Sequence, residues 1–174
     1  EKIDEYKAEK QFGKVGTIEE YFELFTEASM SYDVFHRVEN FSLNKWKEMR
    51  EEGKIVEGRF IKGKVRYAFE DDIPLFVGAY RDEELNEDER DILRLIEDGE
   101  ARTLRRLKKK SDLENDRVKE IVKKLDKNLY IIREYTGKEG WSSKNKYVAL
   151  DVEHSDKEEA EKKIVTRFIK GNGP

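Results

Sequence analysis

Basic side chains are concentrated in one stretch, residues 101–146, which holds 15 Lys and Arg against 7 Asp and Glu. Residues 1–100 have the opposite balance, with 16 basic and 27 acidic side chains. A local excess of positive charge attracts the phosphate backbone of a nucleic acid, even where the net charge of the whole chain is −4. Because 44% of all residues are charged, the alternative interpretation is a solvated basic face without a ligand.

Side chains suited to catalysis are scarce. The chain has no cysteine, two histidines and no glycine-rich phosphate-binding loop, and no nucleophile, base and orienting group occur in a recognisable spacing. We therefore expect no catalytic residue, no metal site and no cofactor. The absence of cysteine indicates an intracellular, cytoplasmic protein, and no apolar run is long enough to span a membrane. A single glutamine with abundant Lys and Glu is typical of heat-adapted proteins.

Three helices are predicted to position the basic side chains of the second half. Asn86 and Glu89 have the spacing of a capping box, and Gly99 can end the helix that they begin. Thr103 is a favourable N-cap for a short second helix. A third helix is expected over residues 114–127, because four apolar residues recur there at the spacing of one helix face. These residues are Val118, Ile121, Val122 and Leu125.

A β-hairpin is predicted after the third helix. Residues 129–135 are rich in aliphatic and aromatic side chains, and residues 146–152 have the pattern of a return strand. Three helices followed by a hairpin is the order of a winged helix, a helix-turn-helix fold whose hairpin flanks the third helix.

The first half of the chain ends with the same pattern. Ser42 begins a helix, residues 55–61 are a predicted strand, and residues 65–69 are its return strand. An internal repeat of this kind usually marks two related domains, and the alternative is a chance likeness between two helix–hairpin junctions. The other segments expected in this copy are helices at 3–12 and 17–27 and a connector at 28–41.

We therefore expect an α+β fold of two tandem winged-helix domains with a C-terminal helix. The expected boundaries are 1–72 for the first domain, 73–86 for a linker, 87–153 for the second domain and 154–174 for the C-terminal helix. Gly171 is expected to end that helix. Its apolar residues lie on one side and are Ala160, Ile164, Val165, Phe168 and Ile169.

The predicted DNA contacts are distributed over these elements. Cations on the second helix would neutralise phosphates, and the third helix would read bases with the side opposite its apolar residues. The hairpins would add phosphate or minor-groove contacts. The alternatives are that Asn115 only caps the third helix and that Trp141 covers the core. The predicted contact residues are Arg105, Arg106, Lys109, Asn115, Lys119, Lys123, Lys138, Trp141, Lys144, Lys146, Lys62 and Lys64.

Two segments resemble known DNA-processing families. Residues 45–63, KWKEMREEGKIVEGRFIKG, resemble the helix-to-wing segment that follows the motor of large-helicase-related ATP-dependent DNA helicases. Residues 167–174, RFIKGNGP, are similar to a segment of the crosslink-unhooking DNA glycosylase family (YcaQ-type), which shares the winged-helix architecture. The chain departs from these families at two points. Asn172 stands where the glycosylase segment has an aromatic residue or His, and the Gln-x-Gln motif of the glycosylases is absent, since Gln11 is the only glutamine.

The resemblance implies the DNA-binding part of an archaeal-type helicase or repair protein. The expected partner is duplex or forked DNA, and a helicase motor elsewhere in a longer protein would be a docking partner. No membrane partner is expected. A second hypothesis is a winged-helix transcription regulator, and a third is a glycosylase-like enzyme, which the missing motif disfavours.

Overall fold

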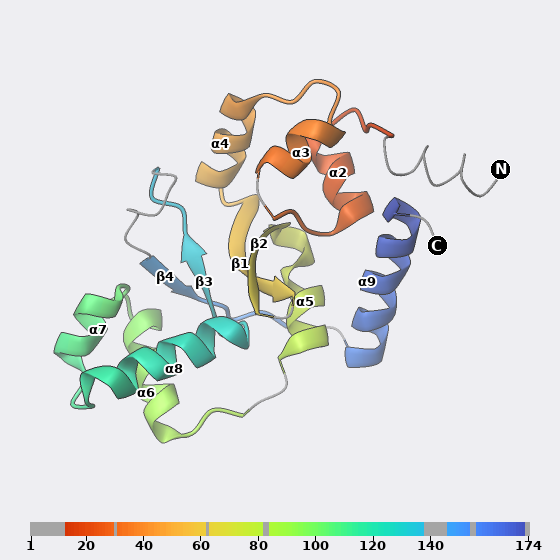
Figure 1. Ribbon diagram of the computed structural model, residues 1–174. Coiled ribbons are helices and arrows are strands. Elements are labelled where there is room, and N and C mark those ends of the chain that lie inside the picture. Colours follow the sequence, from red (N-terminus) through yellow and green to blue (C-terminus); the bar gives the residue numbers. More distant parts are fainter. Residues whose placement is uncertain are drawn as a thin grey trace.

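The computed structural model describes residues 13–29, 31–61, 63–81, 84–137, 146–153 and 156–172. Within these ranges it has eight α-helices and one four-stranded antiparallel sheet, so the fold is α+β as expected (Figure 1). No helix in the described ranges is long and apolar enough to cross a membrane. The elements are α2 (Ile18–Phe25), α3 (Ser31–Arg37), α4 (Leu43–Glu51), β1 (Ile55–Ile61), β2 (Lys64–Phe69), the 3-10 helix η1 (Glu70–Asp72), α5 (Ile73–Tyr80), α6 (Glu87–Glu97), α7 (Leu104–Lys110), α8 (Asn115–Lys127), β3 (Ile131–Glu134), β4 (Lys146–Ala149) and α9 (Lys157–Asn172).

The second half forms the helices and the hairpin predicted for it. The side chain of Asn86 accepts from the Glu89 amide, and the Glu89 carboxylate accepts from the Asn86 amide, both at 3.0 Å. This capping box begins α6, and the Thr103 side chain caps α7. The four apolar residues predicted for the buried face of α8 are all buried. Both strands of the hairpin are shorter than predicted, β3 at both ends and β4 at its C-terminal end.

The first half differs from the prediction in one element. Residues 28–41, expected as a connector, contain the helix α3, whose Val34 is fully buried in the core of this half. The Asp33 carboxylate accepts a hydrogen bond from the Ser29 amide at 2.7 Å, next to the first turn. A helix of two turns is too short to show a clear apolar period, and packing rather than propensity stabilises it. The helix expected at 3–12 lies outside the described residues.

The two halves repeat one arrangement of elements. Each half has three helices followed by a hairpin, namely α2, α3, α4 and β1–β2 in the first and α6, α7, α8 and β3–β4 in the second. In each half, a residue between the first two helices also pairs with the return strand. Ala28 exchanges two backbone hydrogen bonds with Tyr67, and the Arg102 carbonyl accepts one from the Tyr147 amide at 2.7 Å.

The two hairpins join edge to edge in a single sheet. The strand order is β2-β1-β3-β4, and β1 pairs with β3 in antiparallel orientation at Glu57 and Arg133. Each hairpin can be predicted from its own residues but this junction cannot, because no local pattern indicates which strand edges meet.

A central core lies between the two halves. Phe76 of α5 is fully buried and its ring centroid lies 5.0 Å from that of Phe60 on β1. The second half contributes Leu129 and Ile132 to this core, and α9 contributes Ile164. The range 73–86, expected as a linker, therefore begins with a helix that packs in the centre of the molecule.

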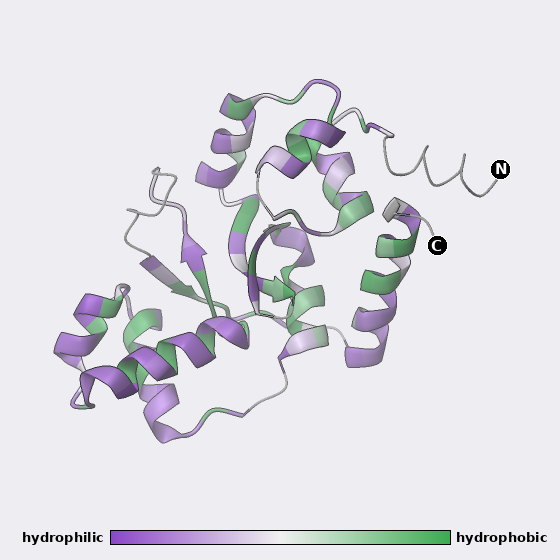
Figure 2. Ribbon diagram, viewed as in Figure 1, coloured by the Kyte–Doolittle hydropathy of each residue, from purple (hydrophilic) through white to green (hydrophobic). Residues whose placement is uncertain are grey.

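The C-terminal helix, α9, packs against α5 and α2. The Arg167 Nη1 atom lies 2.7 Å from both carboxylate oxygens of Asp72. The apolar side predicted for α9 is only partly covered. The ribbon of α9 has bands of hydrophobic colour towards its C-terminal end (Figure 2). Its buried members are Ala160 and Ile164, and its exposed members are Val165, Phe168 and Ile169.

Candidate nucleic-acid interface

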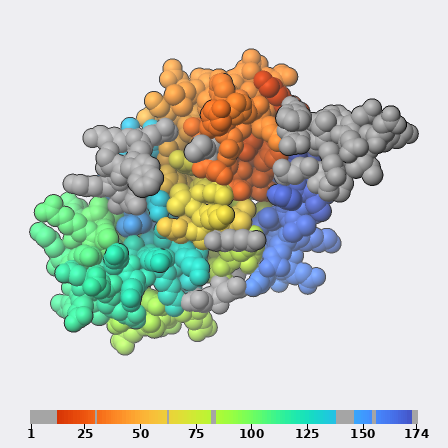
Figure 3. Space-filling model, in the orientation of Figure 1, coloured from red at the N-terminus to blue at the C-terminus, as the bar shows by residue number. Residues whose placement is uncertain are grey.

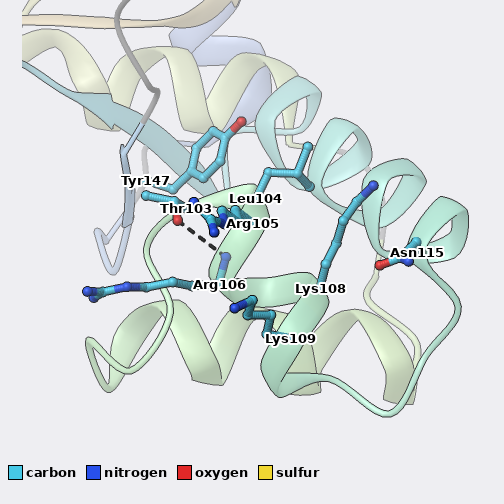
Figure 4. Close-up of a pocket in the computed structure, with 8 residues that line it drawn as sticks. All are labelled: Thr103, Leu104, Arg105, Arg106, Lys108, Lys109, Asn115 and Tyr147. Atoms are coloured by element: carbon cyan, nitrogen blue, oxygen red, sulfur yellow. Dashed lines mark hydrogen bonds between the residues drawn. The ribbon is translucent and has the colours of Figure 1, made fainter.

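A hollow of about 1080 Å³ lies between α7, the beginning of α8 and the strand β4. Four basic side chains of α7 line it, and Tyr147 lines it from β4 (Figure 4). The residues that line it are Thr103, Leu104, Arg105, Arg106, Lys108, Lys109, Asn115 and Tyr147.

The fold of α7 explains why so many cations point outward. Leu107 is the one buried residue of this seven-residue helix, so the charged side chains on either side of it face solvent. Arg105, Arg106 and Lys109 are all exposed. Lysines in the last turn also interact favourably with the negative end of the helix dipole. This stabilising role is the alternative to a role in binding a ligand. That alternative accounts for Lys109 but not for Arg105, which lies in the first turn.

The basic side chains of the second half fall into two groups. One group forms ion pairs, as in Lys110 with Glu100 at 3.0 Å and Lys124 with Glu89 at 3.1 Å. The other group has no ion pair or side-chain hydrogen bond to any residue within the described ranges. Its members are Arg90, Arg105, Arg106, Lys108, Lys109, Lys119, Lys123, Lys127 and Lys146.

Most of the unpaired group lies on two neighbouring helices. Four of its members line the hollow from α7, and three, Lys119, Lys123 and Lys127, lie at exposed positions of α8. The ribbon of α8 has hydrophilic colour along most of its length (Figure 2). Cations that no carboxylate neutralises attract a multivalent anion more strongly than paired cations do. This arrangement therefore favours binding of a polyanion over a solvated face of balanced charge.

The outward side of α8 is as predicted. Asn115, Lys119 and Lys123 are all exposed, one helical turn apart from each other. Asn115 lines the hollow, whereas the two lysines extend the basic surface along the helix beyond it. The N-cap of α8 is Glu114, so Asn115 is the first helical residue rather than the cap.

A second, smaller hollow of about 340 Å³ adjoins the first one. Arg106 lines both hollows, and Lys146 at the beginning of β4 lines the smaller one. Arg102 also lines it, 4.0 Å from the Glu134 carboxylate across the space. Lys146, predicted as a hairpin contact, is thus brought next to the cations of α7.

The remaining predicted contacts are not part of this cluster. Lys64 is exposed at the beginning of β2 and lines neither hollow. It lies near Glu27, where burial raises the pKa of the carboxyl and the charges of Arg66 and Lys64 oppose that rise. Four predicted contacts lie outside the described residues, namely Lys62, Lys138, Trp141 and Lys144.

Tyr147 is not among the predicted contact residues. Its side chain is 7% exposed and its amide binds the Arg102 carbonyl, which places the ring beside the basic cluster. The ring belongs to the core of the second half, so it forms a wall of the hollow. No group of three or more His, Cys, Asp or Glu in the described part of the chain could hold a metal ion.

Comparisons with known proteins add no family assignment. No protein-family model matches the chain, and no curated protein matches it. The resemblance to helicases and glycosylases therefore stays a prediction, and the function is argued from the site itself.

Proposed function

We propose that this chain binds DNA through α7, the outward side of α8 and the second hairpin. The observation that carries the proposal is the group of seven cations on α7 and α8 that have no ion pair within the described residues, four of them around one hollow. Each Lys or Arg that neutralises a phosphate releases a counterion, and this release drives association at low salt.

The order of the elements supports a winged-helix interpretation of the same surface. In that fold the second helix crosses the DNA backbone and the third helix enters the major groove. In this chain α7 would provide the phosphate contacts and α8 the base contacts, with Asn115 suited to adenine. We propose both halves as winged-helix domains, since both have three helices, a hairpin and the extra pairing at Ala28 or Arg102.

The proposed biological role is DNA binding within a helicase or DNA-repair protein, and the alternative is a transcription regulator. These roles differ in the DNA that they require. A helicase-associated domain would prefer a fork or single strand, whereas a regulator would prefer one duplex sequence over others by about 4–10 kcal/mol.

The first prediction is that three cations of α7 supply phosphate contacts. Substituting Arg105, Arg106 and Lys109 by Ala should weaken binding to every DNA sequence, because each contact contributes without reading bases. The slope of log K against log salt should become shallower by about 2–3. Fluorescence anisotropy with labelled duplex and forked DNA over a series of salt concentrations measures both effects.

A matched control removes the same charge elsewhere. Lys45, Lys54 and Lys163 are about half exposed, each in an ion pair on another face of the molecule. Their triple Ala variant should keep both the affinity and the salt slope. Equal losses in the two triple variants would show that net charge, and not this surface, governs binding.

A further inference from the structure

From the end of the third helix through the first strand of the hairpin, the two repeats correspond at a shift of 76 positions, the separation of Glu57 and Arg133. Met49 and Ile55 then match Leu125 and Ile131, all of them buried. The backbone agrees, because Gly53 and its counterpart Leu129 both have positive φ angles, +80° and +56°. A positive φ is uncommon for leucine, so its presence at this position indicates a conserved turn geometry between the repeats.

The junction between the hairpins is centred on equivalent positions. β1 and β3 are antiparallel, and the residue opposite Glu57 is Arg133, its own counterpart. An antiparallel contact between counterparts is the geometry of a two-fold interface, in which each contact occurs twice. The space-filling view agrees, with α2–α4 and α6–α8 forming two lobes on either side of the hairpins (Figure 3).

A chain of charged contacts follows this two-fold relation. Within the repeats, Arg50 Nη2 lies 3.2 Å from Glu57 Oε2, and the counterpart pair, Asp126 Oδ2 and Arg133 Nη2, lies at 3.3 Å. Across the axis, Glu57 Oε1 lies 3.1 Å from Arg133 Nη1. These four side chains are between 5% and 21% exposed, so their charges interact with little screening.

A second contact across the axis also occurs twice. Arg59 Nε lies 2.7 Å from Asp126 Oδ2. The counterparts of these two residues are Tyr135 and Arg50, and the Arg50 guanidinium lies 4.1 Å from the centroid of the Tyr135 ring. The same pair of positions thus forms an ion pair on one side of the axis and a cation–π contact on the other.

The charges at these positions are exchanged between the repeats. The first repeat has Arg50, Glu57 and Arg59, and the second has Asp126, Arg133 and Tyr135. Pairing of the first repeat with a second copy of itself would place Glu57 opposite Glu57 and Arg59 against Arg50. Pairing of the second repeat with itself would place Arg133 opposite Arg133. Like charges directly opposite each other destabilise a strand pair.

We infer that the two repeats form an intramolecular pseudo-dimer, in which the exchanged charges make each hairpin edge a binding surface for the unlike repeat only. The partner of the β1 edge is the β3 edge of the same chain. This selection also protects both strand edges from pairing with like edges of other copies, which is a common route to aggregation. The inference does not depend on DNA binding.

The second prediction tests this selection first with exchange variants, which keep the composition of the wild type. Exchanging Glu57 and Arg133 alone (E57R/R133E) keeps the central pair but creates like charges with Arg50 and Asp126. It should lower the Tm by roughly 10 °C, because these like charges lie side by side with little screening. Adding the exchange of Arg50 and Asp126 should recover part of this loss.

The full exchange adds R59Y and Y135R, so that all three pairs of positions are exchanged. It should recover most of the remaining loss in Tm, because every contact is then present with the residues of the two repeats interchanged. A full exchange that is no more stable than E57R/R133E would overturn the inference.

A double-mutant cycle with neutral substitutions gives an independent answer. The double variant E57Q/R133Q should lower the Tm by less than the sum of the losses in E57Q and in R133Q. Additive losses would contradict the pairing of the two side chains.

Discussion

At the scale of single residues, Glu89 shows how one side chain can act in two contacts. It completes the capping box of α6 and it lies 3.1 Å from Lys124 of α8, with its side chain 4% exposed. Burial alone would raise the pKa of this carboxyl, but the Asn86 amide and the Lys124 ammonium lower it below its ordinary value. The sequence predicts the first contact from spacing, whereas the second requires knowledge of how α6 packs on α8.

The third prediction follows from that pKa. A carboxylate with a lowered pKa in the folded state stabilises the protein above its ordinary pKa, and this contribution is lost as the pH falls through the lowered value. Glu89→Gln should therefore cost about 2 kcal/mol in the free energy of unfolding at pH 7, and the difference from wild type should shrink below pH 4.5. Urea unfolding across this pH range measures it. Glu87→Gln, at an exposed position of the same turn, should show no such trend.

At the scale of elements, the end of α9 departs from the prediction for a physical reason. Gly171 was expected to end the helix, but the helix continues through Asn172 and Gly171 is buried against α2. A Cβ atom at this position would lie 2.8 Å from the Leu24 carbonyl oxygen and 2.9 Å from the Phe25 ring. Glycine is thus required for the close approach of two helices rather than for a turn.

The fourth prediction concerns this approach. Gly171→Ala should lower the Tm although alanine is the better helix former, because the added methyl group forces α9 away from α2. Gly171→Val should lower it further. Hydrogen exchange should accelerate in both α2 and the C-terminal turns of α9. Lys170→Ala, at an exposed position next to it, should leave both measurements unchanged, and an increase in Tm for Gly171→Ala would refute the contact.

Elements with strong local signals are the ones that sequence reasoning predicts. The helices α6 and α7 have N-terminal caps, and α8 has periodic apolar residues, so the exposed cations could be placed from the period of the helix alone. The helix α3 has only two turns, and α5 is apolar on nearly all sides, so neither has a clear period. The pairing of Glu57 with Arg133 and the position of Tyr147 depend on contacts between distant segments, which no local pattern specifies.

At the scale of the whole molecule, the central core decides whether the two halves unfold together. Phe76 belongs to a core shared by both halves and α9, so the boundaries expected at 72 and 87 do not separate two independent cores.

Phe76→Ala should lower the free energy of unfolding by about 3–5 kcal/mol through the cavity that it leaves. This fifth prediction is that amide exchange should accelerate to a similar extent in α4 and α8, because both helices pack on strands that share this core. Leu107→Ala, in the separate core of the second half, is the comparison, and it should accelerate exchange near α7 before it affects α4. Acceleration confined to the first half in Phe76→Ala would mean that the halves unfold independently.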